Sequence, residues 1–567
     1  MLYSVCIIFM NDKNTLSVEL IDRLLPGGLS SPEELEQKYP PRSLPKDAMV
    51  TRFAPSPTGF LHLGSLYASL FSERMAHQSG GVFYLRVEDT DKAREISGAM
   101  DLVIRSLREY GVNADEGPTL EGSENGAYGP YLQSARENIY KAFIKELLIK
   151  GLAYPCFCTT EELDAQHKEQ EEKGIRPGYY GEWAKWRDRS SEDIWAAIGE
   201  GKPFVIRFKS HGNFENKIKV NDILKGDMEL SENDQDIVIL KSDGRLPTYH
   251  LAHVVDDHLM RTTHVTRGDE WLSSLPLHLE LFRAFGWEAP KYGHLAPIQK
   301  MDGSSKRKLS KRKDPEANIA FYGEKGYPNE AVIDYLLNLS SSDFEAWRKE
   351  NPVKDGREFK LTLERMAKSS GPLFDFQKLD DISKETISHF PADEVCRRGL
   401  VWAEKDDPEL FLEMQKNKEY AVAIFGIERE GVERPRKDIA RWSDLRPEIS
   451  YFFDQMFSLD NEQTTVLLNG ITPEDIRAII SSFLETYSEA DTKDEWFAKV
   501  KTLGVKLGFA ESAKEFKLNK EKYKGQVGDV AKVLRVLLTG RTNTPDLHSI
   551  MKVMGRERVE KRLKAFL

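Results

Sequence analysis

Residues 51–65 constrain the fold of this 567-residue chain more than any other stretch. Residues 50–54 have the character of a short buried strand. Two prolines and a glycine between positions 55 and 59 stop regular structure there and predict a tight turn. Apolar side chains then recur at helical spacing, so a helix is expected to begin at His62. The order strand, tight turn and helix predicts the first unit of an α/β domain.

A turn of this kind is suited to binding a phosphate group. The first backbone N–H groups of a helix have no intrahelical partner, and the helix dipole places partial positive charge at the same end. His62 would add a side-chain donor, and Gly64 would let a ligand approach the backbone closely. The pattern alone does not require a ligand, because many α/β domains open with the same unit.

Length, charge and cysteine content limit the class of protein. At 567 residues the chain is too long for one core, so several domains are expected. The formal net charge of −11 excludes a general attraction to nucleic acid, so any RNA contact must come from local basic patches. Four cysteines in so long a chain argue against a disulfide framework and indicate a reducing cytoplasm. The apolar residues 1–10 are too short to span a bilayer, and the sequence leaves open whether Met1 or Met10 is the true start.

Charged residues follow two further predicted strands. Residues 82–87 form the second strand and lead into Glu88 and Asp91, where α/β sheets bind ligands. Asp91 could equally cap a helix that runs to residue 110. The strand at residues 263–266 leads into Arg267, which is suited to a carboxylate. The alternative for Arg267 is a surface ion pair with Asp269 or Glu270.

The insertion at residues 151–236 raises the question of a metal site. Cys156 and Cys158 have the spacing of zinc ligands, but a tetrahedral site needs two more, and the nearby His167 lies in a polar helical run where it is expected to be solvated. No structural zinc is therefore expected, and both thiols are expected to be buried. Aromatic residues beside basic ones in this segment could stack on nucleotides, although a small core is the favoured interpretation. The run at residues 236–240 is expected to resume the α/β sheet.

Basic residues and then helical periodicity dominate the rest of the chain. Residues 300–313 hold seven basic residues and one acidic residue, which is typical of a solvated loop or an RNA contact. From about residue 315 the apolar spacing becomes helical, with clear amphipathic helices predicted at residues 322–339 and 527–538.

Two motifs together carry a resemblance to a known family. Residues 54–65 resemble the first signature of class I aminoacyl-tRNA synthetases in the wording of the glutamyl-tRNA synthetases, with residues 62–65 as their version of HIGH. Residues 308–312 resemble the second signature, the KMSKS loop. The resemblance extends over residues 49–567, and the helical second half is similar to bacterial-type members of that family.

The resemblance implies roles for particular residues. The implied catalytic residues are His62, Gly64, Lys308 and Lys311. Those implied to bind glutamate are Arg52, Ser56, Glu88, Tyr249, His253 and Arg267, although many relatives have Asn at position 253. Those implied to bind ATP are His62, Gly64, Ser65, Glu270, Trp271 and Lys311. Arg436 and Arg535 match positions at which relatives carry anticodon-reading arginines.

The implied fold class is α/β, with a split Rossmann-type catalytic domain, an inserted acceptor-binding domain and an all-helical anticodon-binding region. The expected boundaries are an extension at 1–48, catalytic halves at 49–150 and 237–314, the insertion at 151–236, a stem-contact helical domain at 315–385 and the anticodon-binding domain at 386–567.

The implied activity is ATP-dependent ligation of glutamate to tRNA(Glu), with Mg²⁺ accompanying the nucleotide and no metal ligands of the protein's own. A cytoplasmic monomer without membrane contact is expected. Three alternatives remain open: an enzyme that also charges tRNA(Gln), an enzyme that glutamylates a modified tRNA base, and a non-catalytic tRNA-binding relative. The intact His62 and Lys311 argue against the last.

Overall fold

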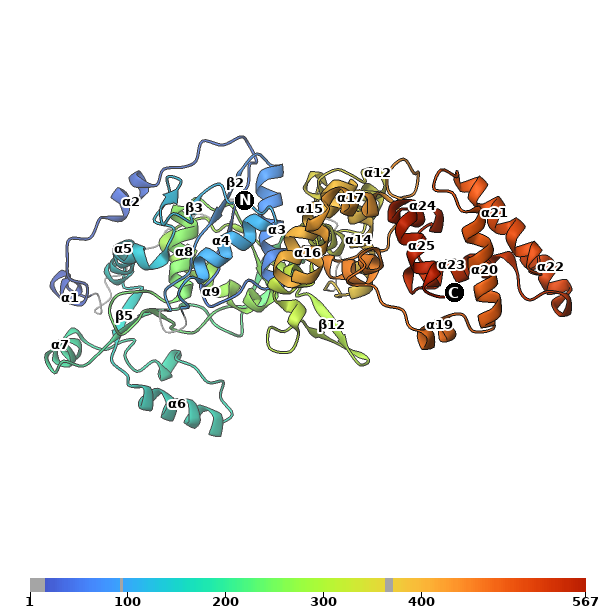
Figure 1. Cartoon of the computed structure of the whole chain (residues 1–567). Coiled ribbons are helices and arrows are strands. Elements are labelled where there is room, and N and C mark those ends of the chain that lie inside the picture. Colours follow the sequence, from blue (N-terminus) through green and yellow to red (C-terminus); the bar gives the residue numbers. More distant parts are fainter. Residues whose placement is uncertain (1–15, 92–94, 363–370) are drawn as a thin grey trace. The chain divides into compact units, whose positions relative to one another are not determined.

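The computed structural model describes residues 16–91, 95–362 and 371–567, and its elements are labelled in Figure 1. It divides into two compact units, each of which is described by itself. The first comprises the described parts of residues 1–320, 336–345 and 357–374, and the second comprises residues 321–335, 346–356 and 375–567. The apolar start at residues 1–10, including Cys6 and the choice between Met1 and Met10, lies outside the described residues.

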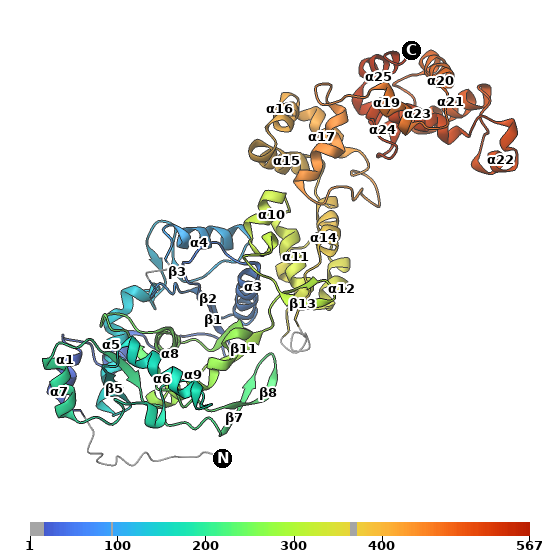
Figure 2. The ribbon, with the colours of Figure 1, turned by 90° about the horizontal axis from the view of Figure 1, so that it is seen from below.

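Four parallel strands from two distant parts of the sequence form the base of the first unit. β1 (Val50–Phe53) pairs with β2 (Val82–Leu85), and β10 (His264–Gly268) pairs with β11 (Lys291–Leu295). The two pairs meet where the N–H of Thr263 donates to the Val50 carbonyl over 3.0 Å. Helix α3 (Leu63–Gln78) packs against β1 and β2 (Figure 2). The predicted split Rossmann arrangement is thus present.

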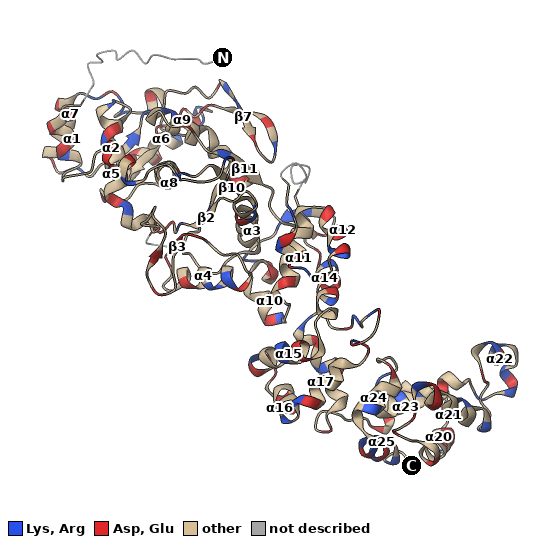
Figure 3. Ribbon diagram, turned by 90° about the horizontal axis from the view of Figure 1, so that it is seen from above, with Lys and Arg blue, Asp and Glu red and all other residues tan. Residues whose placement is uncertain are grey.

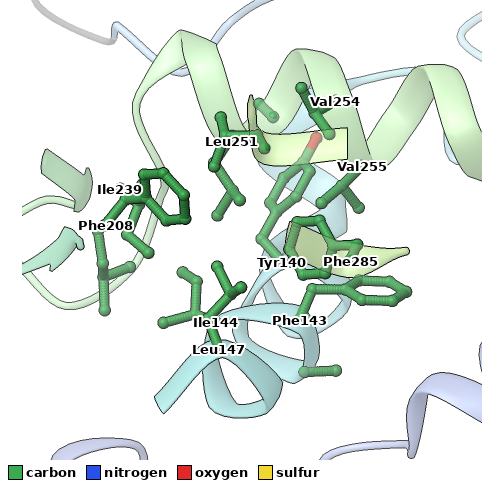
Figure 4. Packing of buried hydrophobic residues seen from close by; sticks show 14 of the residues in the cluster. Tyr140, Phe143, Ile144, Leu147, Phe208, Ile239, Leu251, Val254, Val255 and Phe285 are labelled. Carbon is green, nitrogen blue, oxygen red and sulfur yellow. The ribbon is translucent and has the colours of Figure 1, made fainter. Parts of the chain in front are cut away.

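The apolar core of this unit lies mainly between three helices. α5 (Glu137–Ile149) packs against α8 (Tyr249–Leu259), and α8 packs against α9 (Leu275–Phe285). Figure 4 shows Phe143 of α5 beside Phe285 of α9; their ring centroids lie 5.7 Å apart. Because α8 is buried on nearly all sides, its polar residues must find partners inside the protein.

Residues 16–48 are part of the same core. α1 (Val18–Leu24) and α2 (Pro32–Lys38) pack on α5, and Leu20, Ile21 and Tyr39 are fully buried. Glu36 accepts from Arg261 at the end of α8 over 2.6 Å. The apolar face of residues 16–48 therefore completes the core that α5 and α8 begin.

The insertion forms its own small sheet. β5 (Ala153–Cys156), β6 (Val205–Phe208) and β9 (Val238–Leu240) pair antiparallel in that order. The run at residues 236–240 therefore does not rejoin the parallel strands as predicted. A β-branched run is compatible with either sheet, so the strand with which it pairs determines which sheet it joins. The other elements here are α6 (Thr160–Glu172), η2 (Gly181–Trp183), α7 (Ser191–Gly199), β7 (Lys217–Asp222) and β8 (Gly226–Ser231).

Asp91 does not cap the helix that follows it. That helix, α4, spans Ala99–Glu109, and its N-cap is Gly98 in the left-handed region with φ 77°. The first unit also contains β3 (Gly117–Pro118), β4 (Glu124–Asn125), η1 (Gln133–Arg136), η3 (Asp269–Ser274), β12 (Gln299–Asp302), β13 (Ser305–Lys308) and η4 (Pro315–Ala317).

The helix predicted over residues 322–339 is two helices. α10 (Ala320–Lys325) ends at Gly326, whose φ is +80°, and α11 (Asn329–Ser340) begins after Pro328. A left-handed glycine followed closely by proline ends a helix even where the apolar period continues. α12 (Asp343–Glu350) and η5 (Gly356–Glu358) follow.

From residue 375 on, the described elements are helices. α23 (Val527–Thr539) lies at the centre of a second apolar core and ends at Gly540, as predicted. Acidic and basic residues are interspersed along the helices (Figure 3). Among the described residues no helix is long and apolar enough to cross a membrane. The longer helices here are α14 (Phe376–Ser388), α15 (Ala392–Asp406), α16 (Pro408–Lys416), α17 (Lys418–Gly426), α20 (Pro473–Thr486), α21 (Lys493–Lys506), α24 (Leu547–Met554) and α25 (Arg556–Lys564).

Candidate active site

The turn between β1 and α3 is built around His62, the N-cap of α3. Its ring Nδ1 accepts the N–H of Gly64 over 2.9 Å, so the ring hydrogen is left on Nε2. A Cβ atom at position 64 would lie 3.1 Å from the same Nδ1, a close contact that glycine avoids. Burial, together with the positive charges of Lys311 and Lys308, lowers the pKa of His62 to about 4. At neutral pH His62 is therefore an uncharged donor beside the helix N-terminus.

A cavity of about 650 Å³ opens beside this turn. It is lined by every residue predicted to be catalytic, to bind ATP or to bind glutamate, with the exception of His253. These lining residues are Arg52, Ser56, His62, Gly64, Ser65, Glu88, Tyr249, Arg267, Glu270, Trp271, Lys308 and Lys311. The topology brings them together because the two pairs of parallel strands end at the same edge.

Residues 308–312, called the lysine loop below, contact the turn between β1 and α3. Lys311 Nζ donates to the Phe60 carbonyl over 3.0 Å, and Lys308 Nζ lies 3.4 Å from Glu270. The loop is anchored by Asp314, whose carboxylate accepts from Arg307 over 2.6 and 2.8 Å. The first half of this basic run is the hairpin β12–β13 rather than a plain loop, so Lys308 projects from a strand end.

Arg52 lies on β1 at the inner end of the cavity and is only 5% exposed. Its nearest carboxylate is Asp257, with Nε and Oδ1 3.5 Å apart, and its Nη1 donates to the Thr266 carbonyl over 3.4 Å. Both contacts are long, and the buried Nε makes no hydrogen bond within the described structure. The guanidinium therefore retains hydrogen-bonding capacity, and the residue lines the cavity.

Glu88 lines the cavity next to the turn, where its backbone N–H donates to the Pro55 carbonyl over 2.9 Å. Its side chain is 11% exposed, and its Oε1 accepts from Arg86 Nη2 over 3.2 Å. Burial raises the pKa of this carboxyl, whereas the charge of Arg86 opposes that shift. A cationic group entering the cavity would favour the ionised form.

Arg267 does not pair with its neighbours Asp269 and Glu270. Asp269 contacts Lys225 over 3.0 Å, and Glu270 contacts Lys308 over 3.4 Å. Arg267 instead points into the unit and is 6% exposed. The surface ion pair considered as an alternative is therefore not formed.

His253 is fully buried and is not among the residues that line the cavity. Its ring stacks on Tyr249 with centroids 5.6 Å apart, and its Nε2 lies 3.0 Å from the Tyr292 hydroxyl. Burial lowers its pKa to about 3, so the ring is neutral. The helical step from Tyr249 to position 253 places the second side chain one turn deeper.

Sequence reasoning missed the two acidic residues that organise this region. Asp257 is fully buried and accepts from Arg86 Nη1 over 2.6 Å, while Asp256 accepts from Arg136 Nε over 2.6 Å. The charges of Arg86 and its neighbours hold the pKa of Asp257 well below its usual range, against the effect of burial. The available signal was a pair of aspartates directly after the apolar residues Val254 and Val255 of α8.

Cys156 and Cys158 both contact the hydroxyl group of Tyr179. Cys156 Sγ lies 3.3 Å and Cys158 Sγ 3.5 Å from the Tyr179 hydroxyl. Cys156 is buried as predicted, whereas Cys158 is partly exposed. Trp186 packs on Phe157 with ring centroids 4.7 Å apart, in agreement with a small local core. The described residues contain no group of three His, Cys, Asp or Glu that could hold a metal ion.

The two predicted anticodon arginines lie in the second unit. Arg436 is nearly buried, with Nε 3.3 Å from Asp438, and its backbone N–H donates to the Glu428 carbonyl over 3.0 Å. Arg535 donates to the Pro545 carbonyl over 3.1 Å. The N–H of the next residue, Asp546, donates to the Glu428 side chain over 3.2 Å. The two arginines thus border one connected set of loops.

Comparisons with known proteins agree with this geometry. A family model described as the catalytic domain of class I tRNA synthetases (E and Q) matches residues 48–381, and one described as an anticodon binding domain matches residues 409–567. The glutamate–tRNA ligase of Clostridium perfringens strain SM101 is 50% identical over 97% of this chain and 99% of its own length. That of Sorangium cellulosum is 44% identical over 94% and 98%, respectively.

A solved structure gives the same result. The crystal structure of a glutamate tRNA ligase from Elizabethkingia meningosepticum, in complex with its amino acid, superposes with a TM-score of 0.71 at 27% identity. The match covers 92% of this chain and 99% of that one. These matches confirm the predicted fold class and the family indicated by residues 54–65 and 308–312. The chain belongs to the family of glutamate–tRNA ligases, which are class I aminoacyl-tRNA synthetases.

Proposed function

We propose that this chain activates L-glutamate with ATP and transfers it to the 3′ end of tRNA(Glu). One observation carries the proposal. Lys311 contacts the turn that precedes His62, and Arg52 and Arg267 line the same cavity. One part of the cavity offers donors suited to phosphates, and the other offers two guanidinium groups suited to carboxylates.

In the first step a carboxylate oxygen of glutamate attacks the α-phosphorus of ATP, and pyrophosphate leaves. His62 and the start of α3 would hold one side of the phosphate chain, while Lys308 and Lys311 stabilise charge that builds on the other. Lys311 rests on the Phe60 carbonyl in this structure, so reaching a phosphate requires only a local movement of the loop. Mg²⁺ would arrive with the nucleotide.

In the second step the terminal ribose hydroxyl of the tRNA attacks the activated carbonyl, and AMP leaves. Neither step requires a covalent intermediate with the protein, so the site acts by positioning and by electrostatic stabilisation. Glu88 would pair with the α-ammonium group of glutamate, and Glu270 and Trp271 would border the adenosine.

Arg52 is proposed to select the side-chain carboxylate of glutamate. The neutral amide of glutamine would leave this buried guanidinium without a counter-charge. Arg52→Ala is therefore expected to raise the glutamate KM or abolish activity with little loss of stability. The matched control is Arg42→Ala, which removes a buried arginine that pairs with Glu116 over 2.7 Å outside the cavity. If Arg52→Ala unfolds the protein instead, Arg52 has a structural role.

The direct test of the activity is ATP–pyrophosphate exchange driven by glutamate, with and without tRNA. Exchange that depends on glutamate supports the proposal, and its absence even with tRNA present would refute it. The helical second unit favours charging of a whole tRNA over modification of a tRNA base. Charging assays on purified tRNA(Glu) and tRNA(Gln), with Arg436→Ala beside the wild type, would decide the range of tRNA substrates. We further propose that the protein acts as a monomer in the cytoplasm.

A further inference from the structure

Arg267 is a buried arginine that pairs with no carboxylate among the described residues. Its Nε donates to His294 Nε2 over 3.0 Å, and its Nη1 lies 3.1 Å from His278 Nδ1. Its Nη2 donates to the Trp271 carbonyl over 3.2 Å. Within the described part of the chain it takes part in no ion pair. Buried arginines are normally paired with acids, so this arrangement calls for a reason.

The two histidines can hold Arg267 only as neutral rings. A guanidinium has five donors and no acceptor, so each ring nitrogen that faces it must accept. The hydrogen of His278 is therefore on Nε2, which lies 3.0 Å from His250 Nδ1. The hydrogen of His294 is on Nδ1, which lies 2.6 Å from Asp222 Oδ2. Both tautomers are thus fixed by their partners.

Burial favours the same state. It is the largest influence on both rings and lowers the pKa of each, for His278 well below the ordinary value. The positive charge of Arg267 acts in the same direction on both. His278 is fully buried and His294 is 1% exposed. The pair therefore supplies two rigid acceptors that carry no charge.

We propose that His278 and His294 are positioning residues which fix the Arg267 guanidinium without cancelling its charge, so that this charge is available to a carboxylate of the substrate. The inference rests on the proposed function, because it concerns the glutamate end of the cavity. An aspartate or glutamate in place of either ring would hold the guanidinium as firmly but would neutralise it. Imidazole meets both requirements, since it is a strong acceptor and stays uncharged when buried.

Two variants at one position separate charge from hydrogen bonding. Asn and Asp both place an oxygen close to the position of the His278 Nδ1 atom, and both lose the Nε2–H that faces His250. They have nearly the same shape and differ in charge, with an NH2 group in Asn where Asp has its second oxygen. His278→Asn is expected to keep the glutamate KM within about threefold of wild type, whereas His278→Asp is expected to raise it by about tenfold to a hundredfold. The KM for ATP and the thermal midpoint should not distinguish the two variants.

A purely structural role would give a different result. If His278→Asp and His278→Asn have the same glutamate KM in pyrophosphate exchange, the inference is overturned. If the Asp variant does not fold, His294→Gln and His294→Leu decide, because only Gln keeps an acceptor near the Nε2 position. Equal glutamate KM values for those two also overturn it. A wild type without glutamate-dependent exchange, even with tRNA, would refute the proposed function instead.

Discussion

Replacing Asp257 by asparagine is expected to damage both the stability of the first unit and its affinity for glutamate. The side chain is fully buried and accepts from Arg86 over 2.6 Å, with Arg52 Nε at 3.5 Å. Asparagine has nearly the same shape but no charge, so it would leave two buried guanidinium groups short of a counter-charge. Breaking a buried pair in this way costs about 3–5 kcal/mol.

The pH dependence gives an independent check. The charge of Arg86 holds the pKa of Asp257 well below its usual range, despite burial. Its contribution to stability is therefore fully present above the unfolded pKa of about 3.9 and is lost as the pH falls through the lower folded value. The wild type should lose stability in acid more steeply than Asp257→Asn, because the variant has already lost this contribution.

Asp256→Asn is the matched control. Asp256 is equally buried and accepts from Arg136 over 2.6 Å, but it does not contact Arg52. Both variants should lower the midpoint of unfolding by roughly 5 °C, with faster hydrogen exchange in α8. Only Asp257→Asn should also raise the glutamate KM among molecules that remain folded. Equal glutamate KM values for the two variants would refute the argument that Asp257 positions Arg52.

Three further predictions concern the extension, the turn and the lysine loop. Leu20 of α1 is fully buried, so Leu20→Ala should destabilise the protein by about 2–5 kcal/mol in thermal melts, whereas Val18→Ala should not, because Val18 is 70% exposed. Equal unfolding midpoints for the two variants would show that the extension lies outside the core. Because the pKa of His62 is lowered to about 4, the exchange rate should show no inflection from this residue near pH 6.5; an inflection abolished by His62→Gln would contradict this. Asp314→Asn should slow adenylate formation by roughly tenfold or more with little change in KM, in contrast to the exposed Asp302→Asn, and equal rates would show that the loop needs no anchor.

Local signals in the sequence predicted the elements that local interactions determine. The turn at residues 55–61, the start of α3 at His62 and the end of α23 at Gly540 follow from proline, glycine and the helical spacing of apolar residues. The break between α10 and α11 was also within reach, because Gly326 and Pro328 are ordinary end signals. Apolar residues continue at helical spacing across that break, and residues 322–339 were therefore predicted to form one helix.

Features that depend on distant partners could not be predicted in the same way. β9 pairs with β6 rather than with a parallel strand, and nothing within residues 238–240 distinguishes the two partners. The roles of Asp256 and Asp257 depend on arginines supplied by β1, by the segment after β2 and by η1. Histidine 278 carries no motif of its own, and its function appears only once Arg267 is seen beside it.

The arginines around the cavity differ in how far nearby carboxylates balance their charge. This difference accounts for where the carboxylates of a substrate are expected to bind. Arg86 is fully buried between Asp257 and Glu88, so its charge is used within the fold. Arg52 has one carboxylate at 3.5 Å, and Arg267 has neutral acceptors instead. Charge that is not balanced inside the protein is therefore concentrated where these two side chains line the cavity. A substrate with two carboxylates would balance both, whereas one with an amide would balance one. Discrimination against glutamine should accordingly persist in His278→Asp, because the charge that glutamine leaves unbalanced is that of Arg52, whereas this variant would neutralise Arg267.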